Sequence, residues 1–343
     1  MSTVTFNAHM TEFAGLPVYE YRSPEGMAAQ REWAGKQPNG RREMTDPLAM
    51  LAALRTPGSF AWRLRDSEGW EPGEGEFVRR YYERFCSEVP PESVSTLVIG
   101  NFEETMEVME PEPIRDALVA CAPRWTGLRS LFYADLTYDE CEASWLEHGD
   151  LSALVTSFPS LERLGIRGTG SLSLPVDGHP ALRSLTLQGG GLPADLARQV
   201  LAGDYPALEH LELWLGVENY GGDTSPEALA PLLNGEVHTG VRSLGLRNAE
   251  HTDMWVRALA EAPILERLED LDLSMGTLTD EGARVLLDAP GFRKLRRLDL
   301  HRHFLSEEVE VHVRDAFTSV GVEVDLSERL NAERDGSYPS VTE

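Results

Sequence analysis

The stretch LEHLEL at residues 208–213 follows a pattern, L-x-x-L-x-L, that returns along most of this chain. Further strong copies are LRSLFY at 128–133, LERLGI at 161–166, LRSLTL at 182–187, VRSLGL at 241–246, LEDLDL at 268–273 and LRRLDL at 295–300. Weaker copies are VSTLVI at 94–99 and VEVDL at 322–326. From Leu97 to Leu298, successive middle leucines are 21 to 34 residues apart, and the last two intervals are 27. A pattern that recurs at this period is typical of a repeat protein, in which each copy forms one structural unit.

Alternation within each copy assigns its residues to two faces. Successive side chains of a β-strand point to opposite sides, so the leucines enter the core and the residues between them face outward. Between the copies, residues 226–233, 254–260 and 281–289 carry apolar residues three or four apart, which is typical of helices with one buried face. We expect Asp253 to cap the second of these helices and Thr279 or Asp280 to cap the third.

These elements predict an α/β fold, a leucine-rich-repeat solenoid over residues 94–326. Neighbouring strands pack closer together than neighbouring helices do, which forces a curve. The expected shape is therefore a curved horseshoe, with a parallel β-sheet on the concave face and helices on the convex face.

The two ends of the chain are expected to differ from the repeats. A solenoid end exposes its core unless something covers it, so residues 1–93 are predicted to be an N-terminal capping region. Within it, residues 16–21 and 59–65 read as strands, while 22–45 and 66–75 are rich in Pro, Gly and charge and read as loops. Residues 327–343 lack periodicity and are predicted to be an acidic, disordered tail.

Composition limits the possible partners. The chain has 31 Lys and Arg against 57 Asp and Glu, a net charge of −26. This charge repels polyphosphate, so neither nucleic acid nor a membrane is expected as a partner. The sequence has no apparent signal peptide, no run long enough to span a bilayer and three cysteines without CxxC spacing, which together favour a soluble, reduced, cytoplasmic protein.

Several segments are similar to one bacterial family of leucine-rich-repeat proteins. They are HMTEFAGLPV at 9–18, ECEASWL at 140–146, GGLPA at 190–194, LEHLELWLGVENYGGD at 208–223, LDLSMGTLTDEGA at 271–283 and LRRLDLHRHFLSEE at 295–308. The repeats themselves resemble those of ribonuclease inhibitor. The family has no established catalytic activity, and its members are encoded near radical-SAM enzymes, an ATP-grasp-like protein and a hydrolase. The resemblance therefore implies an accessory role in a biosynthetic pathway.

The concave face is the predicted binding site for a protein or peptide partner. Aromatic and Arg side chains are the residue types that dominate binding energies at interfaces, and an exposed Trp beside Arg is costly without a partner. The other interpretation is a solvated sheet surface on which each Arg pairs with neighbouring acids. The predicted partner-binding residues are Phe132, Arg163, Arg167, His210, Trp214, Arg247, Asp272 and His301.

Two insertions, residues 134–153 and 215–226, follow strands directly and are expected to overhang one rim of the horseshoe. Loops on a rigid scaffold often carry function, although simple length variation is the other explanation. The candidate rim residues are Asp135, Glu140, Trp145, Tyr220 and Asp223.

We find no catalytic motif, no expected cofactor and no complete set of metal ligands in the sequence. Cys141 has no His at a fixed local spacing, and His301 with His303 lacks a clear third ligand. We therefore predict a non-enzymatic binding scaffold. The alternative is a metal-dependent enzyme that uses the acidic loop around Glu140 together with His301.

Overall fold

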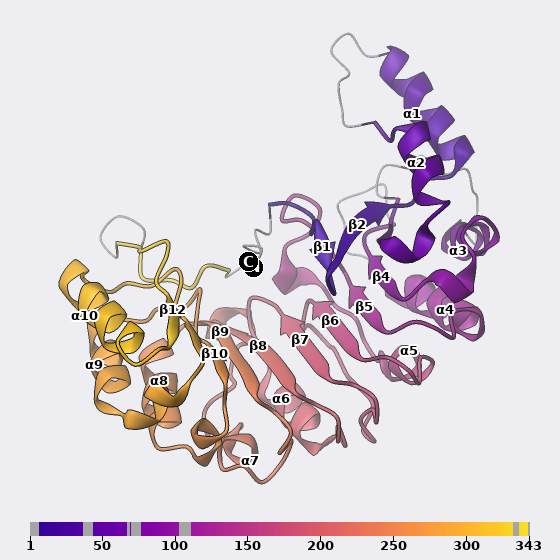
Figure 1. Ribbon diagram of the computed structural model, residues 1–343. Helices are drawn as coiled ribbons and strands as arrows, with labels where there is room; N and C mark the ends of the chain where they lie inside the picture. Colours follow the sequence, from indigo (N-terminus) through magenta and orange to yellow (C-terminus); the bar gives the residue numbers. More distant parts are fainter. Residues whose placement is uncertain are drawn as a thin grey trace. The chain divides into compact units, whose positions relative to one another are not determined.

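The computed structural model describes residues 7–36, 44–66, 69, 77–102, 111–331 and 336–341. The chain divides into two compact units, Met1–Arg167 and Gly168–Glu343. Each unit is an α/β structure with a mostly parallel sheet and helices on one side of it (Figure 1). Among the described residues, no helix combines the length and the apolar character needed to cross a bilayer.

The strands of the N-terminal unit lie in the sheet in chain order. They are β1 (Glu12–Phe13), β2 (Leu16–Glu20), β3 (Ala61–Leu64), β4 (Thr96–Ile99), β5 (Ser130–Tyr133) and β6 (Arg163–Arg167). The helices are α1 (Pro24–Lys36), α2 (Pro47–Ala53), α3 (Phe77–Glu88), α4 (Pro111–Cys121) and α5 (Ser152–Thr156). From β2 to β6 the pairing is parallel, whereas β1 folds back antiparallel on β2.

Register brings the predicted core residues of this unit side by side. Trp62 pairs with Tyr19 and Leu97, and Leu131 pairs with Leu97 and Leu164. Trp62, Leu97 and Leu131 are fully buried, and for the two leucines this is what the alternation predicts. Helix α3 adds aromatic rings to this core, with the ring of Phe85 5.7 Å from that of Trp62.

The sheet continues into the predicted capping region. Strands β2 and β3, which the sequence predicts, pair in parallel with each other, and β3 pairs in parallel with β4. The role of this region as a cap stays a prediction. The prediction of a loop over 22–45 is wrong in part, because Pro24–Lys36 forms α1, which buries Met27 and Gln30. Most of the loop predicted at 66–75 lies outside the described residues.

The C-terminal unit repeats the same arrangement with shorter connections (Figure 1). Its strands are β7 (Ser184–Gln188), β8 (His210–Gly216), β9 (Ser243–Ala249), β10 (Asp270–Asp272), β11 (Arg297–Asp299) and β12 (Glu323–Asp325). Its helices are α6 (Ala194–Ala202), α7 (Ala230–Leu233), α8 (Thr252–Ala260), α9 (Asp280–Asp288) and α10 (Glu307–Thr318).

The middle leucines of the sequence pattern align across this second sheet. The paired series is Leu185, Leu211, Leu244, Leu271 and Leu298, all buried, followed by Val324. Buried apolar surface is the main favourable term in folding, so this column of leucines stabilises the sheet against the helices.

The predicted helix caps are right in one case and wrong in the other. Thr279 caps α9, and its hydroxyl accepts a hydrogen bond from the Glu281 amide at 3.2 Å. Asp253 does not cap α8, whose N-cap residue is His251. The Asp253 carboxylate instead accepts bonds from the Thr279 amide at 2.9 Å and the Thr279 hydroxyl at 2.5 Å, which ties α8 to the next helix.

The prediction of a disordered tail is also wrong for the residues that can be described. The Ser340 amide donates to the Met275 carbonyl at 2.8 Å. Val341 exchanges two bonds with the side chain of Asn248, at 2.5 and 2.9 Å, and both residues are buried. Asn248 has a left-handed backbone (φ 54°), a conformation that asparagine tolerates.

We expect Leu244→Ala to lower the free energy of unfolding by about 2–5 kcal/mol, because it opens a cavity in the column of leucines. The measurement is urea unfolding followed by circular dichroism. The same substitution at Leu48, which is 76% exposed on α2, serves as the control and is expected to change little. Equal effects of the two substitutions would contradict the assigned register.

Candidate functional site

The candidate site is the sheet face that points away from the leucine core, here called the open face. In the C-terminal unit, register places Glu212, Gly245, Asp272, Asp299 and Asp325 side by side on successive strands. Parallel strands lie about 4.8 Å apart, so their side chains form a row across the sheet. We call Glu212, Asp272, Asp299 and Asp325 the acidic row.

Gly245 leaves room for the side chain of Glu212, the first residue of the row. A Cβ atom at Gly245 would lie 2.9 Å from Cγ of Glu212, so the Glu212 side chain leans across the glycine toward the next strand. There it meets Arg247, whose Nη1 is 3.3 Å from Oε1 of Glu212, while Nε is 3.3 Å from Oδ2 of Asp272. One guanidinium group therefore bridges two carboxylates.

Trp214 completes this cluster. The Arg247 guanidinium lies 5.0 Å from the centroid of the Trp214 ring, and the indole nitrogen donates to Glu212 at 2.7 Å. A cation over the face of an aromatic ring is attracted to it electrostatically, and this attraction is stronger when the pair is removed from water. Trp214 is fully buried and Arg247 is 7% exposed, so the pair is part of the protein interior.

Two carboxyl groups of the acidic row have pKa values shifted in opposite directions. Burial raises the pKa of Glu212, but Arg247 and His210 outweigh it and hold that pKa at about 2. The pKa of Asp272 is raised, because burial and the neighbouring charges of Asp299 and Glu212 exceed the attraction of Arg247. At Asp272, burial and the repulsion between neighbouring carboxylates therefore outweigh the attraction of Arg247.

His301 lies beside the far end of the row. Its Nδ1 is 2.7 Å from Oδ1 of Asp299, and its backbone amide donates to the same oxygen at 3.1 Å. These bonds and the charge of His301 outweigh burial and lower the pKa of Asp299. Together with Asp325, these residues offer ligand atoms within 4.8 Å of one another, a set that suits a cation.

Four of the residues predicted to face a partner are in fact buried. They are Phe132, Arg167, Trp214 and Arg247. The expectation of an exposed Trp214 is wrong: its ring is fully buried, Arg247 lies over the ring and Glu212 accepts a bond from the indole nitrogen. A variant that loses both Trp214 and Arg247 is therefore expected to lose stability. Among the other predicted residues, Arg163 is exposed and His210, Asp272 and His301 are half-buried, so their role in binding stays a prediction.

The N-terminal unit contains a parallel cluster around Phe132. A Cβ atom at Gly165 would clash with Cδ2 of Phe132, so the ring lies over that glycine. The Arg167 guanidinium lies 5.6 Å from the ring centroid, and its Nη1 is 3.7 Å from Oδ1 of the buried Asp135. The sequence signal for both clusters is the pair LGIR at 164–167 and LGLR at 244–247, which reasoning from the repeat pattern alone missed.

The predicted rim residues have mixed environments. Asp135 is buried, and Glu140 forms ion pairs with Arg65 and, at 3.2 Å, with His9. Asp223 accepts a bond at 2.6 Å from the amide of Ala194, the first residue of α6, so it has a structural role. Tyr220 is half-buried, whereas Trp145 is 62% exposed.

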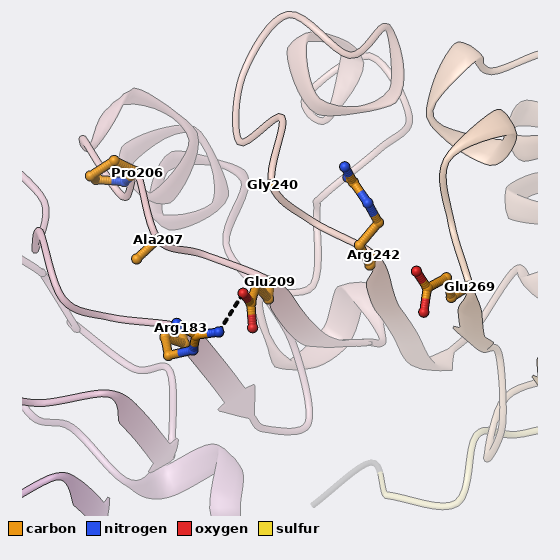
Figure 2. Close-up of a pocket in the computed structure, with 7 residues that line it drawn as sticks. All are labelled: Arg183, Pro206, Ala207, Glu209, Gly240, Arg242 and Glu269. Carbon is orange, nitrogen blue, oxygen red and sulfur yellow. Dashed lines mark hydrogen bonds and ion pairs between the residues drawn. The ribbon is translucent and has the colours of Figure 1, made fainter.

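An open pocket of about 510 Å³ lies at the amino-terminal ends of β7 to β10 (Figure 2). The residue before each strand contributes to it, and these residues are Arg183, Glu209, Arg242 and Glu269. Figure 2 shows the ion pair between Arg183 and Glu209, 2.5 Å long.

The sequence contains a signal for this row of charges, which the search for leucines also missed. The second position of the six-residue pattern alternates between Arg and Glu, from Arg129 to Arg296.

The chain is similar to a protein of known structure. A crystal structure of a protein from Bacteroides fragilis, solved as a structural-genomics target, is similar to this chain with a TM-score of 0.71 and 29% sequence identity. The match covers 78% of this chain and 73% of that protein. No family model and no curated protein matches the sequence. The likeness supports the α/β fold and assigns no activity to it.

We expect Arg247→Met to lower the free energy of unfolding at pH 7 by about 3–5 kcal/mol, because Glu212 and Asp272 would remain without their shared cation. The measurement is urea unfolding between pH 7 and pH 2, with Arg163→Met as the exposed control. In the wild type, the low pKa of Glu212 contributes stability above pH 4.5 that is lost as the pH falls toward 2. In Arg247→Met the trend is expected to reverse, since protonation relieves the repulsion. A variant with unchanged stability would contradict the cluster.

Proposed function

We propose that the chain is a leucine-rich-repeat solenoid whose open face in the C-terminal unit binds a cationic segment of a partner protein or peptide. On this proposal the protein is a scaffold and catalyses no reaction. The observation that carries it is the acidic row, which lies on a face made by side chains of successive strands.

The charge on this face supports a cationic partner. On β8 to β12 the open face carries six carboxylates against two guanidinium groups, those of Arg247 and Arg297; the acids are Glu212, Asp270, Asp272, Asp299, Glu323 and Asp325. Arg247 and Arg297 already pair with acids of the row. Complementary charge favours fast and selective association, so a segment rich in Lys or Arg fits this face.

The accessible acids are the ones available for contact. Side chains of Asp270 and Asp272 are 25% and 27% exposed, and Glu323 is exposed. Asp325 is half-buried at the end of the acidic row. Asp270 already pairs with Arg296, and Asp272 already pairs with Arg247. Glu323 and Asp325 can therefore meet a partner without breaking the buried cluster of Glu212, Arg247 and Trp214.

The alternative proposal, a metal-dependent enzyme that uses Glu140 and His301, has less support. Glu140 already pairs with Arg65 and His9 and accepts the Thr137 amide at 2.9 Å. His303 is also engaged, since its Nε2 lies 3.1 Å from the Leu326 carbonyl and its Nδ1 accepts from the Leu305 amide. A cation at Asp299, His301 and Asp325 would have to displace the bond between Asp299 and His301.

The family resemblance adds an expectation about the partner. Because proteins of that family are encoded near radical-SAM enzymes, we propose that the cationic segment belongs to a protein of the same biosynthetic pathway. On this proposal the chain has an accessory role, in which the open face holds its partner.

We expect Glu323→Gln with Asp325→Asn to weaken binding of a fluorescent Lys/Arg octapeptide about tenfold at 50 mM NaCl, because two carboxylates of the open face are lost. The measurement is fluorescence anisotropy. The control removes the same charge from helices, by Asp195→Asn with Asp288→Asn, and is expected to change affinity little. An equal loss in both variants would show that only the net charge matters and would overturn the proposed site.

A further inference from the structure

A short N-terminal segment, residues 9–15, covers the open face of the N-terminal unit. We call it the strap. Its side chains Met10 and Phe13, with Leu16 and Val18 of β2, pack against a buried apolar cluster on β3, β4 and β5, which consists of Ala61, Val98 and Phe132. The rings of Phe13 and Phe132 meet edge-on, with centroids 5.7 Å apart. The strap thus occupies the surface that in the C-terminal unit is open.

His9 fixes one end of the strap by charge. Its Nδ1 is 3.5 Å from Oδ2 of Asp135 and its Nε2 is 3.2 Å from Oε2 of Glu140. The Met10 carbonyl accepts a bond from Arg63, and the Met10 amide lies 3.4 Å from Oδ1 of Asp135. An imidazolium ion at this place bridges two carboxylates, whereas a neutral imidazole leaves them without that cation.

The strap is joined to the sheet by few backbone bonds. It pairs with β2 only through Glu12 and Phe13, with one further bond from the Val18 amide to the Thr11 carbonyl at 2.9 Å. Its turn uses positive φ angles at Ala14 (52°) and Gly15 (77°). Beneath the strap, strands β2 to β6 pair with one another in parallel without using the strap. A segment joined by few backbone bonds opens at a lower free energy than the complete ladder beneath it, so the strap can lift while the sheet stays folded.

We propose that the strap is a pH-sensitive cover, which the charge on His9 holds closed over the apolar strip of Ala61, Val98 and Phe132. When His9 loses its proton, the strap opens more often and exposes this strip. The strip is then a second surface of the protein, distinct from the acidic row, and its exposure is under the control of pH.

The charged groups around His9 determine the direction of the effect. They are Arg63 and Arg65 from β3, Asp135 and Glu140 from the segment after β5, and Arg167 from β6. Burial lowers the pKa of His9, but its bonds to Asp135 and Glu140 outweigh burial and Arg65 and raise that pKa above 6.5. The pKa of Glu140 is about 2 and that of Asp135 is also lowered, so both stay ionised above pH 6.

The sign of the pH dependence follows from linkage. Because the pKa of His9 is raised in the closed state, its contribution is complete below pH 6.5 and is lost as the pH rises through the raised value. The strap is therefore closed in mild acid and opens toward alkaline pH. Its opening constant rises by up to tenfold for each unit by which the pKa is raised.

The test is hydrogen–deuterium exchange of the whole chain at pH 6 and pH 8, read by mass spectrometry on peptides that span residues 9–18 and corrected for the intrinsic exchange rate. We expect protection of these amides to fall several-fold at pH 8. Variant His9→Gln is expected to show the low protection at both pH values, and His9→Lys to keep protection at both. The control His312→Gln, at an exposed position on α10, is expected to follow the wild type.

Two results would overturn this proposal. Equal protection of the wild type at pH 6 and pH 8 would show that His9 does not control the strap, and this result needs no variant. Protection in His9→Gln equal to that of the wild type would show the same. Thermal melting followed by circular dichroism checks that His9→Gln is folded, and reduced protection confined to 9–18 separates strap opening from unfolding of the unit.

Discussion

The in-register pairing of parallel strands is the constraint on which the other features depend. Because Leu211, Leu244, Leu271 and Leu298 must align to bury their side chains, the residues between them must align as well. A one-residue slip would turn every leucine toward solvent, so burial fixes the register strongly. The acidic row is a consequence of this alignment, since four carboxylates at one position of the pattern become neighbours in space. The hydrophobic core thereby positions the charges that the proposed function uses.

Two glycines modify this regular sheet in the same way. Gly165 and Gly245 have no side chain, so Phe132 and Glu212 from the preceding strand lie across them. Two residues later, Arg167 and Arg247 close over an aromatic ring. Burying a guanidinium group costs desolvation energy, which nearby carboxylates and the ring offset. Each unit thus contains a rigid, charged cluster, while the remaining acids of the C-terminal unit stay accessible.

The sequence predicts the repeated strands well and the environment of single residues less well. Alternation of leucines is a local property, and it correctly places Leu244 and Leu271 in the core. Trp214 is buried with Arg247 of the neighbouring strand over its ring, a contact that alternation does not describe. Likewise, Phe132 is buried by the strap, 119 residues earlier at Phe13, and Val341 docks on Asn248 across 93 residues. Such contacts link distant segments, and a pattern with a short period cannot show them.

The most direct test of this account is the pKa of Asp272, measured by carbon-detected NMR of the carboxyl group during a pH titration. If Asp272 stands in a row with Glu212 and Asp299, its pKa lies above the usual 3.8 and falls when Asp299→Asn removes one neighbouring charge. The contrary result is a pKa of Asp272 at or below 3.8 that does not change in Asp299→Asn. It would mean that these carboxylates are not neighbours, and it would contradict the acidic row and the binding face built on it.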